Sequence, residues 1–357
     1  MNLSKPQQMA MEHFTNYAKN HQQQAIATIH HILKMSNISV STYEKAVNNL
    51  KGKARIGLHF HPDRLDNTMK TVAESLLDQG VYKSQFETLI SNGSVSAYPG
   101  GHRDNWEKRL FGGAYQIEGT KNSERPKYGA LQILPHADGP APRFGSCYFL
   151  LSPKVSTRST FTYLDSHQDP KEKGTYEAFE MIMATLLADS FQSECAIGER
   201  NLTPPRLIQH LLKTIDLPMS EQVVQKPSRN LNHYVEAQIH GDISLQDDVE
   251  ILVADPSFQG TPIGSLLEKI AQTYSIDLYW HQGFTLSVDE VPTDFRGPTM
   301  PSLAKRIANN NDINAQLIGS AVLDLYQNPK NWEDRGTHQE VLQELKLLWH
   351  VLVRYGK

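Results

Sequence analysis

The 357-residue sequence predicts an α+β fold in which a strand-rich middle lies between helical flanks. Near both ends of the chain, apolar residues recur at helical spacing. In the middle, apolar and aromatic runs are bounded by Gly, Pro and Ser, as strands are. The helices inserted there do not alternate regularly with the strands, which argues against a βαβ sheet. We therefore expect a helical segment at 1–52, a central catalytic domain at 53–290 and a helical segment at 291–357.

Composition narrows the class of protein. Hydrophobic residues make up 39% of the chain and charged residues 21%, enough apolar side chain for a core. The net charge of -4 disfavours a nucleic-acid partner, and no apolar run is long enough to span a membrane. Two cysteines are too few for a disulfide framework. Because the first residues lack a secretory signal, we expect a soluble protein that is cytoplasmic or delivered by a Sec-independent route.

The elements are expected in the following order. A helical hairpin occupies 5–35, with its turn in the polar stretch 20–24, and the next helix begins at Ser41 as its cap. A helical tail follows from 300 to 355, split at Pro329. Other helices are expected at 41–50, 67–78, 177–190, 205–215 and 263–273, and strands at 54–60, 128–134, 145–151, 159–164, 233–240, 249–254 and 276–280.

A glycine-rich segment at 91–113 is expected to be a long irregular loop with a function. Glycines allow a ligand to approach the backbone, and an arginine fork matches pyrophosphate oxygens. The segment matches neither the dinucleotide fingerprint nor a phosphate-binding P-loop. Its aromatic and basic residues nevertheless favour a dinucleotide ligand, with Arg109 as a phosphate contact. The alternative is that this segment is an ordered surface loop without a ligand.

The sequence LHFHPDR gathers polar groups where a strand ends. His59 and His61 share one strand face. Pro62 ends the strand, so Arg64 lies just beyond the strand end. Such a pair of histidines is also a possible start of a divalent-metal site. A structural role for one histidine, with Arg64 at the surface, stays open.

Two later strands show polar side chains on one face. In 233–240, period-two alternation aligns Tyr234, Glu236, Gln238 and His240 opposite three apolar residues that should be core. The alternative is that this polar face is merely solvated.

In 159–164 the same alternation puts Ser159 and Phe161 on one face, with Thr160 and Thr162 on the other. This second pattern alone is weak, because threonine is an ordinary strand former.

The chain contains, in sequence order, an Arg or His at a strand end, a strand with Ser and Thr, and a Glu on a later strand. This order resembles the Arg-Ser-Glu class of ADP-ribosyltransferases. The segments LHFHPDR and YVEAQIHG are also similar to an uncharacterised bacterial branch of that superfamily, which has effector and toxin members. The resemblance covers about the middle two-thirds of the chain. It implies a split β-sandwich whose cleft holds NAD as substrate, and a protein acceptor for the ADP-ribose.

The resemblance also implies roles for individual residues. His61 or Arg64 would fix the adenosine side of NAD, and Ser159 and Thr160 would support the site. Glu236 would be the catalytic carboxylate that stabilises the oxocarbenium-like state as nicotinamide leaves.

Tyr234 and Gln238, on the same strand face as Glu236, could donate hydrogen bonds to its carboxylate and help bind NAD. Many members of the class have Gln or Glu where Tyr234 stands. Glu236 could therefore be that upstream residue, with Gln238 at the catalytic position of a crippled transferase.

Two other functions remain open at this point. One is a metal-dependent hydrolase that uses His59 and His61 with a later ligand chosen from His136, His167, Glu236 or Asp255. The other is a scaffold without catalysis, whose helical flanks bind a partner.

Overall fold

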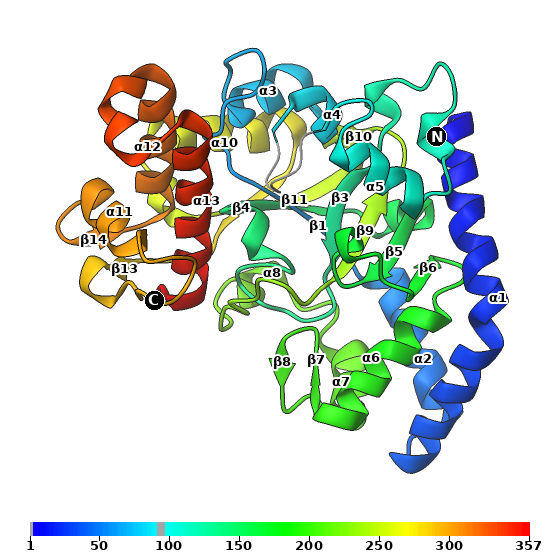
Figure 1. Cartoon of the computed structure of the whole chain (residues 1–357). Helices are drawn as coiled ribbons and strands as arrows, with labels where there is room; N and C mark the ends of the chain where they lie inside the picture. The colour runs from blue at the N-terminus through cyan, green and yellow to red at the C-terminus, as the bar shows by residue number, and fades with distance from the viewer. Residues whose placement is uncertain (1–2, 91–96) are drawn as a thin grey trace.

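The computed structural model describes residues 3–90 and 97–357, and it confirms the α+β class. Eight strands form one hydrogen-bonded sheet in the order β12-β11-β4-β1-β3-β9-β5-β6. All neighbours are antiparallel except β11 and β12. The sheet lies at the centre of the molecule, between helices at both ends (Figure 1). The strands bearing the three motifs, β1, β5 and β9, all belong to it.

Seven strands of the sheet fall close to their predicted positions, and β6 was not predicted. The eight strands are β1 (Ile56–Phe60), β3 (Lys127–Leu131), β4 (Cys147–Leu151), β5 (Ser159–Tyr163), β6 (Lys173–Thr175), β9 (Val235–Ile239), β11 (Val249–Ala254) and β12 (Asp277–Trp280). Two-residue strands pair outside the sheet, namely β2 (Val81–Tyr82) with β10 (Ile243–Ser244), β7 (Cys195–Ala196) with β8 (Glu199–Arg200), and β13 (Leu286–Ser287) with β14 (Asp312–Ile313).

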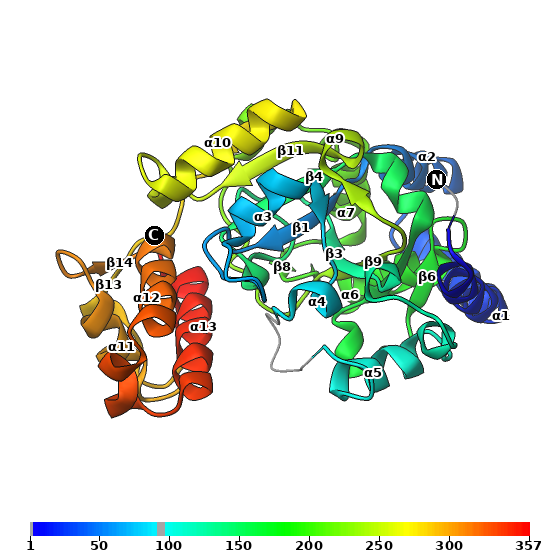
Figure 2. The ribbon, with the colours of Figure 1, turned by 90° about the horizontal axis from the view of Figure 1, so that it is seen from above.

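Helices pack around the sheet in three groups. α1 and α6 lie side by side at the β6 end, α3 and α10 contact each other near β1 and β11, and α11, α12 and α13 stand at the opposite side of the molecule from α1 (Figure 2). The helices of these groups are α1 (Lys5–Met35), α3 (Val72–Gln79), α6 (Glu180–Ser193), α10 (Pro262–Tyr274), α11 (Met300–Ile307), α12 (Ala315–Gln327) and α13 (His338–Tyr355). The remaining α-helices described are α2 (Val40–Lys53), α4 (Gln85–Thr88), α5 (His102–Leu110), α7 (Pro204–Lys213), α8 (Met219–Gln222) and α9 (Leu245–Asp248).

The expected N-terminal hairpin is wrong, because α1 is one continuous helix of 31 residues. The stretch 20–24 is polar but contains no Gly or Pro, so nothing in it breaks a helix. Its side chains are mostly exposed, while Phe14, Ala18 and Ile29 on either side are buried. The next helix begins earlier than predicted, since the Ser39 hydroxyl accepts the Thr42 amide and Ser41 lies inside the helix.

The glycine-rich segment is not wholly irregular, because α5 lies within it. Residues 91–96 of the predicted loop lie outside the described residues. Gly112 and Gly113, with φ of 61° and 82°, follow the end of the helix. The aromatic and basic residues that suggested a ligand are thus held on a helix. Only the side chains on one side of this helix are buried in the interior.

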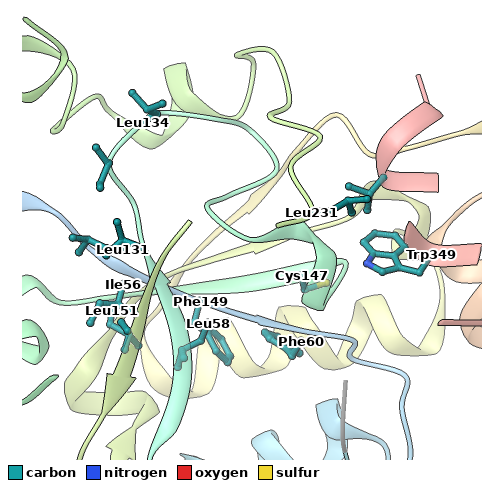
Figure 3. Close-up of a cluster of buried hydrophobic side chains, with 14 of the residues drawn as sticks. Ile56, Leu58, Phe60, Leu131, Leu134, Cys147, Phe149, Leu151, Leu231 and Trp349 are labelled. Carbon is teal, nitrogen blue, oxygen red and sulfur yellow. The ribbon is translucent and has the colours of Figure 1, made fainter. Parts of the chain in front are cut away.

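One core joins the predicted segments. It includes Leu50 from α2, Phe149 from β4 and Leu348 from α13, so the C-terminal helices pack on the same interior as the sheet. Figure 3 shows Trp349 of α13 beside Leu231, near Cys147 at the start of β4. The helical tail is confirmed with Pro329 opening a 3-10 helix between α12 and α13. In the described part of the chain, no helix has the length and apolarity needed to cross a bilayer.

Candidate functional site

A cleft of about 920 Å³, part of it open to solvent, lies against the face of the sheet that carries Glu236. Glu236 of β9 and Tyr234, which directly precedes β9, line it, and so do His59 of β1 and Tyr128 of β3. β1, β3 and β9 are neighbours in the sheet, so period-two alternation brings these side chains to one face.

Glu236 is buried and held by three donors. The Ser166 hydroxyl and the Gln238 amide both donate to its Oε1, the latter at 2.9 Å. The Ser166 backbone amide donates to Oε2 at 3.4 Å. Ser166 is itself positioned by Trp106, whose indole N–H donates to the Ser166 carbonyl oxygen at 2.9 Å. The carboxyl group is therefore fixed in orientation at the cleft wall.

Burial and the nearby charge of Asp165 raise the pKa of Glu236 from 4.5 to about 8, against the lowering effect of its donors. The carboxyl group is therefore mostly protonated at neutral pH when the cleft is empty. A cation entering the cleft would favour the ionised form, because an opposite charge lowers the pKa of a carboxyl.

The polar face predicted for residues 234–240 is confirmed, and it is buried rather than solvated. Gln238 donates to the Thr162 hydroxyl at 3.1 Å and accepts from the Thr160 hydroxyl at 2.7 Å. Thr160 also lies 3.2 Å from Nε2 of His240, whose Nδ1 is bonded to the Tyr115 hydroxyl. A chain of hydrogen bonds thus runs beneath the cleft and ends at Glu236.

Ser159 and Thr160 are brought near the site but do not line it. Both are fully buried, and the Ser159 hydroxyl donates to the Val155 carbonyl oxygen at 2.9 Å. Their place in β5 is beside β9, so they position the strand that carries Glu236. Phe161 enters the core, as alternation predicts.

The two residues that flank Glu236 on its strand face behave differently from each other. Gln238 is fully buried and absent from the cleft wall, which it affects only through Glu236. Tyr234 does line the cleft, but its hydroxyl donates to Asp165 at 3.2 Å and not to Glu236. The second predicted donor is thus replaced by Ser166, which follows β5 in a 3-10 helix.

A cationic and aromatic wall faces the sheet from α5. The guanidinium of Arg103 lies 4.5 Å from the ring of Trp106 and 5.2 Å from the ring of Tyr128, and all three line the cleft. Arg103 is 5% exposed, and its buried Nε and Nη1 have no hydrogen-bond partner. An unpaired guanidinium at a cleft wall is suited to binding an anion.

Arg109 is not brought to this cleft. It is exposed on α5 and donates to the Asn105 carbonyl oxygen at 3.3 Å. Arg109 lies six positions from Arg103, which does not bring it to the same face of a helix with 3.6 residues per turn. The segment HRDNWEKR therefore contains the right residue type, but helical spacing decides which arginine faces inward.

His61 and Arg64 line a neighbouring pocket of about 740 Å³ rather than the cleft that contains Glu236. Tyr82, Gln85 and Tyr128 border both spaces, so the two adjoin. Burial lowers the pKa of Arg64, and one of its terminal nitrogens lacks a partner.

His59 belongs to the Glu236 cleft, and its ring lies against the Tyr148 ring with 4.9 Å between centroids and a tilt of 31°. Its two ring nitrogens contact the Gly145 carbonyl oxygen at 3.3 Å and the Ala141 amide at 3.2 Å. Burial lowers the pKa of His59 to about 3, so the ring is neutral.

Both ring nitrogens of His59 are therefore occupied by backbone groups. His59 thus has no free nitrogen with which to bind a metal ion together with His61. Among residues 3–90 and 97–357, no three His, Cys, Asp or Glu side chains are grouped so that they could hold a metal ion. The hydrolase alternative thus lacks a ligand set in the part of the chain that the structure describes.

Two basic residues that the sequence did not single out complete the cleft. Arg143, in the 3-10 helix η3 (Pro142–Phe144), and Lys346, on α13, both line it. Arg143 lies 3.9 Å from Asp165. No local pattern joins these residues, because their proximity depends on α13 docking against η3. The apolar face of α13 signalled that docking, as Leu345, Leu348 and Val351 are buried.

A model of DUF3626, a family of proteins of unknown function, matches residues 55–355. The match includes the whole sheet and the C-terminal helices that supply Lys346. None of the curated proteins compared with the chain matches it.

Proposed function

The chain belongs to the DUF3626 family, and because that family has no known function, we propose one from the cleft: an NAD-dependent ADP-ribosyltransferase with Glu236 as catalytic carboxylate. The observation that carries this proposal is the environment of Glu236, which lines a cleft with aromatic and basic side chains and is oriented by Ser166 and Gln238. The same arrangement favours Glu236 over Gln238 as the catalytic group, since Gln238 does not reach the cleft.

The reaction breaks the bond between C1′ of the ribose and the nicotinamide nitrogen. Nicotinamide leaves with the bonding electron pair, and positive charge develops on C1′ and the ring oxygen of the sugar, as in glycoside hydrolysis. A carboxylate that accepts a hydrogen bond from the 2′-hydroxyl stabilises this charge. The acceptor then bonds to C1′ and releases a proton. Of the cleft residues, Glu236 is suited to the carboxylate role because its donors fix its direction without neutralising it.

The raised pKa of Glu236 fits a substrate that is itself a cation at the reacting end. The pyridinium ring of NAD carries a positive charge, so its arrival favours loss of the Glu236 proton. Trp106, Tyr128 and Tyr234 offer aromatic surfaces beside this carboxyl group for a flat ring. The empty cleft therefore avoids a buried negative charge that substrate binding would later compensate.

The rest of the dinucleotide would extend along the adjoining spaces. Arg103 offers an unpaired guanidinium for a phosphate oxygen beside the cleft. The adenosine side would lie in the neighbouring pocket bordered by His61 and Arg64, which meets the cleft at Tyr82. The resemblance implies a split β-sandwich around NAD, whereas the eight strands form one sheet in which β5 pairs beside β9. The acceptor that the resemblance implies is a protein.

The test is release of nicotinamide from NAD by the purified protein, measured for wild type, Glu236→Gln and Glu268→Gln. Glu268 is exposed on α10 and serves as the matched control. We expect Glu236→Gln to lower the rate about a thousandfold, as loss of a transition-state electrostatic group does, and Glu268→Gln to have no effect.

NAD should also raise the melting temperature of both wild type and Glu236→Gln, because the variant removes the charge and keeps the cleft. If NAD neither loses nicotinamide nor raises the melting temperature, the proposal is wrong. If nicotinamide release occurs but a chelator abolishes it, the metal-dependent alternative gains instead.

A further inference from the structure

Four basic side chains from three separate segments lie close enough to affect one another's charge, and two of them, Arg143 and Lys346, line the cleft. The four are Arg143 in η3, Arg296 in the loop before α11, and Lys346 and His350 on α13. Lys346 and His350 are four positions apart and therefore share a helix face. The Trp349 indole N–H donates to the Pro142 carbonyl oxygen at 2.9 Å, which ties α13 to η3 next to Arg143. Figure 3 shows Trp349 beside Leu231, whose carbonyl oxygen accepts a hydrogen bond from Arg143.

The polar atoms of this basic cluster are largely unpaired. The Nε atoms of Arg143 and Arg296 and both ring nitrogens of His350 are buried without a hydrogen-bond partner. His350 is 2% exposed. A buried donor left without a partner costs about 1–3 kcal/mol. Because the neutral His350 ring has one donor and one acceptor nitrogen, the cluster holds three such donors, which is unusual unless a ligand completes them.

The charges of Arg296 and Lys346 have no ion pair among the described residues. Of the cluster's four members, Arg143 alone has an ion pair among the described residues, at 3.9 Å to Asp165. Burial together with the charges of Arg143 and Arg296 lowers the pKa of Lys346 to about 8. Burial and the charges of Arg296, Arg143 and Lys346 lower the pKa of His350 to about 2. The cations thus repel one another, and the ion pair with Asp165, which also lines the cleft, reaches only Arg143.

The backbone at Arg296 is also strained in favour of this arrangement. Its φ of 65° is in the left-handed region, which costs an arginine about 1–2 kcal/mol. The ring of Phe295 lies 5.1 Å from the guanidinium and itself contacts Tyr355 at 5.4 Å. Strain that holds a charged group among like charges is typical of ligand-binding positions.

We propose that Arg143, Arg296 and Lys346, backed by His350, form a binding site for a phosphoryl group at the Glu236 cleft. Planar guanidinium forks match phosphate oxygens, and a lysine adds a point charge. Arg143 and Lys346 line the cleft, so the bound phosphate would lie within reach of the substrate space. The bound phosphate would supply both a negative charge and hydrogen-bond acceptors to these basic side chains. The phosphate is either part of NAD's diphosphate or part of a phosphorylated acceptor.

The existence of the site does not depend on the proposed transferase activity, and its first test uses inorganic pyrophosphate alone. We expect calorimetry to show binding to wild type and a loss of about tenfold to a hundredfold in affinity for Lys346→Met, the effect of removing one charged hydrogen bond. Lys269→Met, exposed on α10, should bind as wild type does. Lys346→Met should also melt at the same or a higher temperature, because it removes a repelling cation.

A second measurement tests whether pyrophosphate binds near His350, and not elsewhere with an indirect effect of Lys346→Met. The imidazole resonances of His350 should shift when pyrophosphate is added to wild type, and should shift little in Lys346→Met. Absence of binding to wild type at millimolar pyrophosphate, or equal affinity in Lys346→Met, would overturn the site, whatever NAD does.

Titrating pyrophosphate into NAD-saturated protein distinguishes the two sources of the phosphate. Competition with NAD assigns the site to the dinucleotide's own diphosphate. Simultaneous binding assigns it to a phosphate on the acceptor. If NAD itself does not bind, the transferase proposal fails while the pyrophosphate result still decides the site.

Discussion

Two walls of the cleft both bury polar side chains, the wall on β9 with β5 beside it and the wall on η3 and α13. Only the first wall pairs these side chains with one another. Gln238 engages Thr160, Thr162 and Glu236, whereas both nitrogens of His350 are unpaired. A satisfied network fixes one geometry at low cost, and an unsatisfied one destabilises the empty protein until a ligand arrives. The contrast separates a wall built to hold a reacting group from a wall built to receive a charged one.

The largest effect that tests this contrast is expected at Gln238. Replacing it with leucine keeps the volume but removes a donor to Glu236 and an acceptor for Thr160, both buried. We expect the free energy of unfolding to fall by about 3 kcal/mol, since each stranded group costs about 1–3 kcal/mol. Denaturant unfolding of Gln238→Leu measures this. Gln209→Leu, exposed on α7, should change stability by less than about 0.5 kcal/mol.

The pH dependence of catalysis is the next largest effect. Because the pKa of Glu236 is raised to about 8 and its ionised form is the active one, kcat/KM should rise about fiftyfold from pH 6 to pH 8 and level off above pH 9. The pKa of Lys346 is also about 8, so the profile should be repeated in Lys346→Met, where we expect the same rise. A flat profile in wild type would contradict the role given to Glu236.

The sequence predicted the first wall better than the second, for physical reasons. Period-two alternation fixes which side chains of β9 share a face, so Tyr234 to His240 could be placed from residue types alone. Ser166, which replaces Tyr234 as donor to Glu236, lies 70 positions away and follows a different strand. Burial of the β9 face was also unpredictable, since a polar strand face is solvated unless another element covers it.

The second wall has no local signature at all. Pro142 and Trp349, whose hydrogen bond aligns the basic cluster, are 207 positions apart. The same limit explains α1, where a polar stretch at 20–24 indicated a turn although no residue there interrupts a helix. It also explains Arg109, because the sequence of α5 does not show which of its arginines, Arg103 or Arg109, faces the cleft. Patterns within a segment predict its faces, but not which distant segment completes a site.

A smaller effect distinguishes those two arginines. Arg103→Met should raise the KM for NAD about tenfold, because it removes an unpaired guanidinium from the cleft. Arg109→Met should leave KM within about twofold of wild type, since the Arg109 side chain is exposed. Steady-state nicotinamide release from both variants provides the comparison. Equal effects in the two variants would mean that α5 contributes only general positive charge.

The smallest effect is expected at His350, and its sign matters more than its size. Leucine there removes two unpaired buried nitrogens and keeps most of the side-chain volume. The free energy of unfolding should stay equal or rise by up to about 1 kcal/mol, opposite to Gln238→Leu, because no hydrogen bond is lost and an unpaired polar group is removed. Denaturant unfolding of both variants under one set of conditions makes the comparison direct. A loss of stability at His350 as large as that at Gln238 would mean that His350 has a structural partner, and the two walls would no longer differ in kind.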